Sequence, residues 1–410
     1  MATKIRNVIF CLIGVFILCA AIWYKIADTG NFLPDALHNG KTSYLEGKAL
    51  QPLPSLSIGK FADGTFQDEA EDYLSGCWPA RDEAMLSNAA LQRMTIEFAA
   101  TPFGYDVYPT FYGSEVAYDR QHALLCNILK PATNDAITQY EQAAEQYNDF
   151  IKRHKDIPVV LYWVDELSSS SNNPTLSLIL NPVDSRFLTQ HFLDRLDDSA
   201  IVIDGTLDST ESWTEEYFRT DHHWNNPIAY DAYCKALDSL APKSEPCEFD
   251  EIVWEGIPFY GSLARTGLYL PAEPDILVDH WIDLGDTTVT INGEEQDADS
   301  VDHRTAYDNQ LYNREPLTNR YSEYYHNDYE LIAFKNANAQ SEESLLIVGP
   351  SYTNNMERFF SKNFRNVYCF DPRKSDSTLE EIMYAHQADR ILFLIGSSEA
   401  TNASFLGSLK

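Results

Sequence analysis

Apolar runs of strand length alternate with stretches of helical periodicity along most of the chain. Five apolar runs predict strands, and they cover residues 157–164, 200–205, 344–348, 366–370 and 390–395. The run at 157–164 is continuous enough for a strand buried on both faces, and the run at 344–348 also predicts a buried strand. Three stretches have apolar residues at helical spacing, at 136–153, 184–196 and 378–388. Because strands that alternate with helices form parallel βαβ units, the pattern predicts an α/β fold with a parallel sheet flanked by helices.

Two further patterns predict elements outside this alternation. Residues 66–94 have acidic residues first and then apolar residues at helical spacing, which predicts two short helices joined at 77–80. Residues 105–118 are rich in aromatic and β-branched side chains, which predicts strands with a turn at Gly113.

A long, polar and turn-rich segment covers residues 276–338. The dipeptide Asn292-Gly293 within it is typical of a tight hairpin turn. We interpret the segment as a β-rich insertion that packs on the sheet. Residues 27–65, rich in Gly, Pro and Ser, are typical of a stalk, and residues 66–410 are predicted to form one α/β domain with this insertion.

The amino terminus has the pattern of a membrane segment. Residues 8–24 are uncharged and apolar, which is about the shortest run that spans a bilayer as a helix. Lys4 and Arg6 precede the run, so the amino terminus is expected in the cytoplasm. We predict a signal anchor over residues 1–26, hence a single-pass cell-membrane protein with an extracytoplasmic carboxyl-terminal domain. The alternative is a cleaved signal peptide, with Cys19-Ala20-Ala21 as the cleavage site.

The amino-acid composition limits the classes of partner and ligand that the protein is expected to bind. Thirty basic residues against 62 acidic ones give a net charge of −32, which repels phosphate backbones, so no nucleic-acid partner is expected. Five cysteines lie beyond the apolar run, none of them in a CxxC pair of the kind that binds zinc. Cys234 and Cys247 are close enough in sequence to form a disulfide, and buried free thiols are an equally good interpretation.

The sequence Asp221-His222-His223-Trp224 is the first candidate for chemistry. It is compatible with a metal site, an acid/base pair or a surface turn. No second cluster of His or Asp at metal-ligand spacing accompanies it, so we predict neither a metal nor another cofactor. The Asp-x-His spacing lets the Asp221 carboxylate hold the His223 imidazole from one short loop.

Ser351 is the second candidate, because it follows a predicted strand and Gly349-Pro350. Sites in parallel α/β sheets form beyond the carboxyl ends of strands. A helix that begins after Ser351 would point its first N–H groups at an oxyanion formed beside the hydroxyl. The other interpretation is a serine that merely caps that helix. A serine nucleophile also needs a base and a group that orients the base, and His223 with Asp221 could supply both.

Several blocks of the sequence resemble the DHHW protein family. Residues 219–233 resemble the signature of that family, and residues 345–373 resemble its carboxyl-terminal serine segment. Residues 71–82, 259–267 and 320–336 are similar to further blocks of the family in the same order. The DHHW family is similar in turn to SGNH-hydrolase-like O-acetyltransferases that modify exported polysaccharides, of the alginate O-acetylation type.

The resemblance implies an SGNH-like sheet and an acyl-serine mechanism. It implies that Asp221 orients His223, that His223 is the general base and that Ser351 is the nucleophile. The implied substrate is a cell-surface polysaccharide or other glycan, and a membrane acyltransferase partner would supply the acetyl group by analogy. An esterase differs only in using water as the acceptor. The alternative function is a non-catalytic carbohydrate-binding or envelope-assembly protein that retains the fold.

Five residues are assigned a supporting place around this triad: His222, Trp224, Gly349, Tyr352 and Arg373. Trp224 and Tyr352, together with Tyr260, are aromatic and could stack on sugar rings. Two positions depart from the family pattern, because Pro350 stands where the family usually has aspartate and Ile228 where it prefers glycine.

Overall fold

The computed structural model describes residues 54–55, 57–76, 81–100, 107–109, 115–128, 135–170, 172–174, 185–297 and 316–410, with residues 23, 45 and 301. The chain divides into two compact units. Unit 1 consists of Met1–Ser114, Arg265–Tyr269 and Leu317–Asn319, and unit 2 of Glu115–Ala264, Leu270–Pro316 and Arg320–Lys410. The predicted single domain over 66–410 therefore has to be corrected, because its first part belongs to unit 1.

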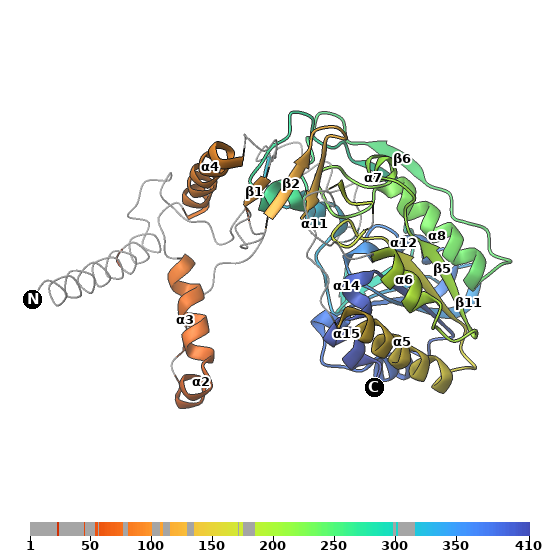
Figure 1. Ribbon diagram of the computed structural model, residues 1–410. Helices are drawn as coiled ribbons and strands as arrows, with labels where there is room; N and C mark the ends of the chain where they lie inside the picture. The colour runs from red at the N-terminus through yellow and green to blue at the C-terminus, as the bar shows by residue number, and fades with distance from the viewer. Residues whose placement is uncertain are drawn as a thin grey trace, which may run out of the picture. The chain divides into compact units, whose positions relative to one another are not determined.

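Unit 1 contains helices of quite different length (Figure 1). They are α2 (Ile58–Asp63), α3 (Thr65–Gly76) and α4 (Arg81–Ala100). The Ser57 hydroxyl accepts a hydrogen bond from the Lys60 N–H and caps the start of α2, and Gly64 caps its end with φ +91°. This helix lies in the predicted stalk, whose composition gave no sign of it. The two helices predicted over 66–94 are present, although α4 is long rather than short.

A sheet of eight strands forms the centre of unit 2, in the order β5-β4-β13-β11-β12-β10-β8-β9. The first five are parallel and correspond to the five predicted strands: β5 (Ala200–Gly205), β4 (Val159–Val164), β13 (Arg390–Ile395), β11 (Ser341–Val348) and β12 (Phe364–Phe370). The predicted α/β class with a mostly parallel sheet is confirmed.

Three strands of the segment predicted as an insertion on the sheet instead extend the sheet. Strands β8 (Thr288–Ile291), β9 (Glu294–Gln296) and β10 (Leu331–Lys335) form its antiparallel edge. Asn292 and Gly293, with φ +49° and +83°, make the predicted hairpin turn between β8 and β9. Strand β10 pairs with the side of β12 that β11 leaves open, and this pairing satisfies backbone groups that an isolated insertion would leave exposed.

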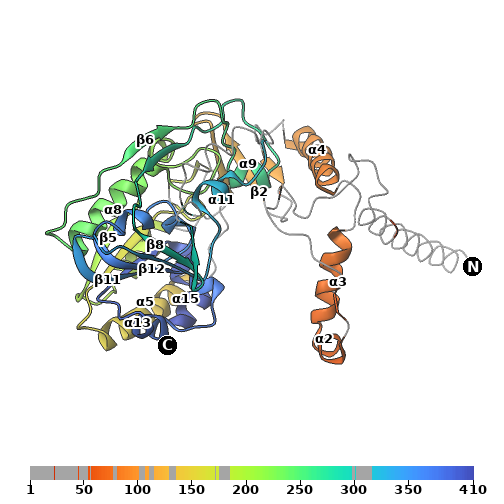
Figure 2. The same ribbon diagram turned by 180° about the vertical axis from the view of Figure 1, so that it is seen from behind.

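Helices cover both faces of the sheet (Figure 2). One face packs against α5 (Ala136–Arg153), α6 (Ser185–Leu193), α13 (Leu379–Ala385) and α15 (Ala403–Ser408). Trp163, Phe192 and Phe393 belong to this core and are buried. The long helix α8 (Asn226–Leu240) covers the other face. Strands β4, β11 and β13 in the middle of the sheet are buried on both sides, so continuous apolar runs were a reliable signal for them. Strand β5 lies at the edge of the sheet, and Ile201 and Val202 on it are exposed.

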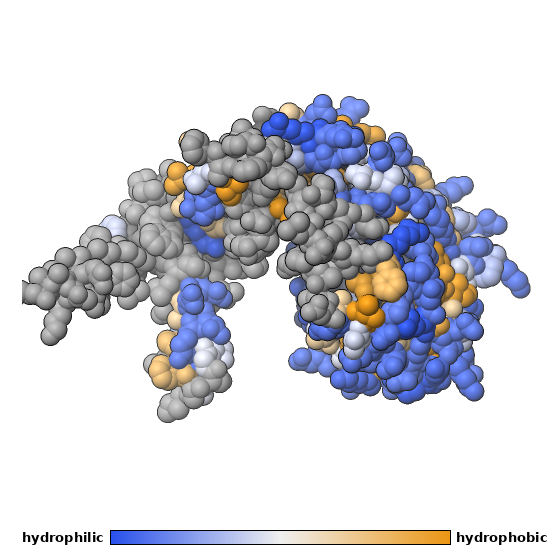
Figure 3. Space-filling model, viewed as in Figure 1, coloured by the Kyte–Doolittle hydropathy of each residue, from blue (hydrophilic) through white to orange (hydrophobic). Residues whose placement is uncertain are grey.

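The visible face of unit 2 is mostly hydrophilic, as the acidic composition leads one to expect (Figure 3). The predicted anchor over 1–26 and most of the predicted stalk lie outside the described residues, as do Cys77 and the turn at Gly113. Within the described residues, no helix has both the length and the hydropathy that a bilayer span requires. Cys234 and Cys247 are free thiols, which favours the second of the two interpretations given to them.

Candidate active site

The DHHW sequence forms a tight loop between two helices. The helix α7 (Thr210–Glu216) ends just before it, and α8 begins just after it, where the Asn225 side chain caps the first turn. Tyr217 and Trp224 form an isolated antiparallel bridge across the base of the loop. The Phe218 N–H also donates to the His223 carbonyl, so the loop is a small closed hairpin.

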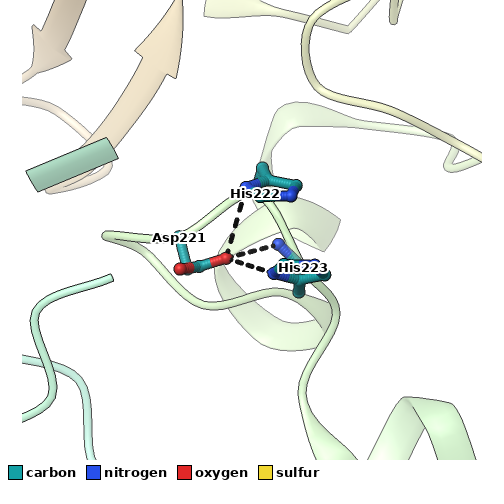
Figure 4. A group of neighbouring side chains, drawn as sticks. All are labelled: Asp221, His222 and His223. Carbon is teal, nitrogen blue, oxygen red and sulfur yellow. Dashed lines mark hydrogen bonds and ion pairs between the residues drawn. The ribbon is translucent and has the colours of Figure 1, made fainter. Parts of the chain in front are cut away.

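Asp221 is buried in this loop and holds His223 (Figure 4). Its Oδ1 accepts hydrogen bonds from the His223 backbone N–H at 3.0 Å and from Nδ1 at 2.5 Å, and its Oδ2 accepts from the Ser262 N–H at 2.5 Å. Burial by itself would raise the pKa of Asp221, but the charges of His223 and His222 and these hydrogen bonds lower that pKa well below its ordinary value. The group is therefore a carboxylate at neutral pH.

The other ring nitrogen of His223 contacts the predicted nucleophile. Nε2 lies 2.7 Å from Ser351 Oγ, so one chain of hydrogen bonds runs from Asp221 through His223 to Ser351. The proton on Nδ1 is the one donated to Asp221, and this tautomer leaves Nε2 to accept the Ser351 hydroxyl proton. Asp221 and His223 are buried, whereas Ser351 is half-buried. The structure thus brings the three predicted residues together.

The turn that presents Ser351 depends on Gly349. A Cβ at Gly349 would lie 2.7 Å from the Leu394 carbonyl oxygen, a backbone atom of the neighbouring strand β13. Pro350 follows with φ −83°, a value that proline favours. The replacement of the family's aspartate by Pro350 is therefore compatible with a turn that aims Ser351 at His223.

The expected helix after Ser351 is not there. Ser351–Thr353 form a single 3₁₀ turn, η5, and α12 (Glu357–Phe360) begins after three intervening residues and is one turn long. The backbone between them bonds three residues back, as from the Met356 N–H to the Thr353 carbonyl, and the intervening Asn355 side chain accepts a hydrogen bond from Trp224 Nε1 at 2.8 Å. The sequence-based expectation that a helix dipole stabilises an oxyanion here is wrong, because so few peptide dipoles are aligned.

His222 lies on the exposed side of the site, with 41% of its side chain accessible. Its Nδ1 is 2.6 Å from Ser262 Oγ and 3.5 Å from Asp221 Oδ1, and its ring centre is 3.8 Å from that of His223. His222 is therefore more than the spacer of an Asp-x-His pattern, since it contacts Asp221, which holds the base, and Ser262, whose N–H donates to Asp221.

The ligand atoms of Asp221, His222 and His223 lie within 4.8 Å of one another, so these residues could hold a metal ion. No other such group of three or more exists in the part of the chain that the structure describes. Three ligands of these types suit zinc. Both His223 nitrogens, however, are already engaged, with Asp221 and with Ser351, and an ion on Nδ1 would displace the carboxylate contact. The residues fit a hydrogen-bonded triad better than a metal, and the absence of a metal stays a prediction.

The predicted aromatic residues pack rather than bind. Trp224 and Tyr352 are 1% and 3% exposed, and their rings meet edge to face at 5.6 Å. The Tyr352 hydroxyl donates to the His222 carbonyl at 2.7 Å, which ties the Ser351 turn to the DHHW loop. The hypothesis that these two residues stack on a sugar ring is therefore wrong. Tyr260 is partly exposed, so stacking of a sugar ring on Tyr260 stays a prediction.

Arg373 supports the strand end next to the site rather than the triad. Its Nη2 donates to Asp371 at 2.7 Å and to Asp328 at 3.2 Å. A small pocket lies here, against the back of the Ser351 turn, and its lining includes Asp328, Gly349, Pro350, Asn354, Glu357 and Asp371. Arg373 is thus neutralised by two carboxylates and offers little attraction to an anionic substrate.

Two residues of the site were not predicted from the sequence, and they are Ser262 and Tyr321. A Cβ at Gly261, just before Ser262, would lie 2.2 Å from Asp221 Cβ, so only glycine lets this backbone approach the carboxylate. The Tyr321 ring stacks on His223 at 3.7 Å and 8°. Both residues fall in blocks that resemble the DHHW family, at 259–267 and 320–336, but no spacing within the sequence assigned either of them a role.

Comparisons with known proteins give a family match and a shared fold. The family model described as DHHW protein matches residues 207–370. No curated protein sequence matches the chain. A DHHW family protein from Eubacterium siraeum DSM 15702 has a similar structure, with a TM-score of 0.54 and 20% identity over 72% of this chain and 94% of that one.

Other solved structures are similar as well. PatB1 of Bacillus cereus aligns with a TM-score of 0.57 and 18% identity, over 71% of this chain and 98% of that one, and a second PatB1 structure carries a sulfonyl adduct. The O-acetyltransferase domain of Pseudomonas putida AlgJ aligns with a TM-score of 0.38 and 13% identity, over 72% and 98% of the two chains. At these identities the matches to the Eubacterium siraeum protein and PatB1 show a shared fold and nothing finer. The segment that contains Asp221, His223 and Ser351 matches the DHHW protein family, and the resemblance seen in the sequence is confirmed.

Proposed function

We propose that this protein is an SGNH-like serine O-acyltransferase or esterase that acts on a cell-surface polysaccharide. The observation that carries the proposal is the continuous hydrogen-bond chain from the Asp221 carboxylate through the His223 imidazole to the Ser351 hydroxyl. A buried carboxylate, a base held in one tautomer and a half-buried serine are the parts that acyl transfer through serine requires.

The first half of the reaction acylates Ser351. His223 Nε2 takes the hydroxyl proton while Oγ bonds to the carbonyl carbon of the acyl donor. When the tetrahedral intermediate collapses, the bond to the leaving oxygen breaks and that oxygen takes the proton from Nε2. Asp221 stays ionised throughout and offsets the positive charge that forms on the imidazole. General-base help of this kind is worth roughly 10²–10⁴-fold in rate.

The second half moves the acyl group to the acceptor. A sugar hydroxyl gives its proton to His223 Nε2 and attacks the acyl carbon, and Ser351 Oγ leaves with that proton. If water takes the place of the sugar, the same steps give an esterase. The half-exposed Ser351 leaves room for either acceptor at the surface of unit 2.

The similarity to PatB1 supports the choice of nucleophile. A sulfonyl reagent forms an adduct with an activated nucleophile, and one PatB1 structure carries a sulfonyl adduct. In this chain the corresponding chemistry fits Ser351, because its hydroxyl lies 2.7 Å from Nε2 of His223, whose Nδ1 is held by Asp221.

The setting of the enzyme is part of the proposal. We propose that a signal anchor over residues 1–26 holds the domain outside the cytoplasm. An acetyl donor then has to come across the membrane, and we propose a membrane acyltransferase as the partner that supplies it. The net charge of −32 and the paired state of Arg373 favour a glycan without dense negative charge as the acceptor.

Adduct formation tests the proposal directly. The full chain is incubated with 4-nitrophenyl acetate or with a sulfonyl fluoride, and the labelled residue is located by mass spectrometry. We expect label on Ser351 in the parental protein, and none after Ser351→Ala or His223→Ala. Ser397→Ala is the matched control, since Ser397 also follows a buried strand and a glycine, and it should label like the parental protein. A parental protein that binds glycan but takes no label would support the non-catalytic alternative and refute ours.

A further inference from the structure

The His223 imidazole lies between two aromatic rings. Tyr321 covers one face with a centroid distance of 3.7 Å and an interplanar angle of 8°, and His222 contacts the other at 3.8 Å and 37°. The Tyr321 contact is the more nearly parallel of the two, so the flat face of the phenol ring lies against the flat face of the base.

The same tyrosine also binds the nucleophile's backbone. Its hydroxyl donates to the Ser351 carbonyl oxygen at 3.1 Å. Burial first, then the nearby Tyr325 and Asp221, raises the pKa of Tyr321 well above its ordinary value, so the phenol stays protonated and keeps its donor. One side chain therefore touches His223 through its ring and Ser351 through its hydroxyl.

Tyr321 is itself held rigidly. It begins the helix α11 (Arg320–Tyr325) together with Arg320, is 6% exposed, and packs in a cluster with Phe218, Trp254 and Tyr324. The neighbouring Tyr325 meets its ring at 4.8 Å and donates its own hydroxyl to Asn226. Because the ring has no freedom to turn away, it fixes the plane of the imidazole.

We propose that Tyr321 is a positioning residue of this site, which keeps His223 aligned with Ser351 and stabilises the imidazolium that forms during acyl transfer. This inference rests on the proposed function. The imidazole is neutral before the proton moves and cationic afterwards, and the face of an aromatic ring attracts a cation more than a neutral ring. An interaction that is stronger in the transition state lowers the barrier.

The expected size follows from cation–π energies. A ring face next to a desolvated cation corresponds to roughly a 3- to 30-fold effect on kcat. Because the proposal gives Tyr321 no contact with the acceptor, KM should change little when Tyr321 is replaced. A residue that served only to fill space would change stability and leave kcat per folded molecule alone.

Three variants of the full chain separate these roles. Tyr321→Phe keeps the ring and loses only the hydroxyl, Tyr321→Leu loses the ring, and Tyr324→Leu is the matched control. Tyr324 is on the same helix, is 1% exposed and packs on Trp254 rather than on the base. For each variant, kcat and KM are measured on 4-nitrophenyl acetate, and Tm is measured to confirm folding.

We expect Tyr321→Leu to lower kcat about tenfold with KM unchanged, and Tyr321→Phe to keep kcat within about threefold of the parental value. Tyr324→Leu should lower Tm as much as Tyr321→Leu and leave kcat unchanged. The inference is overturned if Tyr321→Leu keeps the parental kcat, if it changes KM instead, or if Tyr324→Leu loses kcat equally. If the parental protein turns over no ester and Ser351→Ala behaves alike, the proposed function fails first and this inference falls with it.

Discussion

Two loops at the carboxyl end of the sheet have the same local design and different chemistry. After β11 comes Gly349-Pro350 and then Ser351, and after β13 comes Gly396 and then Ser397, the first residue of α14 (Ser397–Ala400). Both glycines are required by a close neighbour, because a Cβ at Gly349 would meet Leu394 and a Cβ at Gly396 would meet Glu166. Strand, glycine and serine therefore do not by themselves make a nucleophile.

The difference lies in what the rest of the fold brings to each loop. Ser351 faces the imidazole of His223, whereas Ser397 contacts the Ser169 hydroxyl. The Ser397 loop also carries a buried carboxyl pair, since Ser398 Oγ donates to Glu166 and to Glu399. A base within reach comes from a segment 128 residues away in the sequence, so the active-site assignment depends on a long-range contact.

The electrostatics of the two loops are opposite as well. Asp221 faces histidines, which lower its pKa and keep it ionised. Glu166 is buried opposite Glu399, and burial first, then that neighbouring charge, raises the pKa of Glu166 to about 7. One loop thus favours a stable negative charge beside a base, and the other favours a neutral carboxyl.

The largest expected effect separates the two serines. Ser351→Ala should lower kcat for an acetyl ester by roughly 10³–10⁶-fold, because the nucleophile is lost and only binding remains. Ser397→Ala should stay near the parental kcat. Steady-state rates for the two variants, with Tm measured in parallel, check this. Comparable losses in both would show that the two loops do not differ as proposed.

A second prediction compares the two carboxylates. Asp221→Asn should lower kcat by roughly 10²–10⁴-fold, because an amide neither fixes the His223 tautomer nor offsets the imidazolium. Glu399→Gln changes a carboxylate of the other loop and should leave kcat within about threefold. Rates on the same ester decide the point, and a drop in Glu399→Gln as deep as that in Asp221→Asn would contradict it.

The third prediction uses glycines at which a methyl group does not fit. An alanine at Gly261 would place Cβ 2.2 Å from Asp221 Cβ, so the carboxylate has to move and kcat should fall about a hundredfold. An alanine at Gly396 would place Cβ 2.8 Å from Glu166 Cδ, which should cost about 1–3 kcal/mol of stability and no kcat. Chemical denaturation and ester turnover measured on both variants test this. If Gly396→Ala lost turnover and Gly261→Ala did not, the assignment of the two loops would be reversed.

The elements that sequence predicted well are those set by local periodicity. The five parallel strands and α5 appear within a few residues of their predicted bounds, because a buried strand or amphipathic helix must repeat its apolar pattern locally. The hairpin at Asn292-Gly293 was also predicted. Its place at the edge of the sheet was not, since pairing with β12 through β10 is decided by contacts far away in the sequence.

The residues of the site also fall into those that the local sequence identifies and those that only long-range contacts bring together. Asp221 and His223 are two residues apart, and Ser351 follows a recognisable strand, so a spacing and a family resemblance were enough to select them. Tyr321 reaches the site from a short helix of another segment, and nothing in its own neighbourhood distinguishes it from Tyr324 or Tyr325. The helix predicted after Ser351 is not formed, and in its place Asn355 makes a contact with Trp224 across 131 residues that no local pattern could indicate.

The smallest effect concerns the pH dependence of stability in the second loop. The pKa of Glu166 is raised in the folded protein, so folding favours its protonated form. Its contribution to stability is complete below the ordinary pKa of about 4.5 and is lost as the pH rises toward about 7.

Glu166→Gln mimics the protonated carboxyl, so it should raise Tm by roughly 2–4 °C at pH 8 and change it little at pH 4.5. Turnover should be unchanged, because Glu166 is not part of the triad. The pH dependence has the opposite sign for Asp221, whose pKa is lowered in the folded protein. Its contribution to stability is present at neutral pH and is lost only when the pH falls below the ordinary pKa range of a carboxyl group. Thermal unfolding of the parental and Glu166→Gln proteins across pH 4.5–8 measures the difference, and a Tm gain at pH 4.5 rather than pH 8 would show that the carboxyl pair is ionised in the folded state.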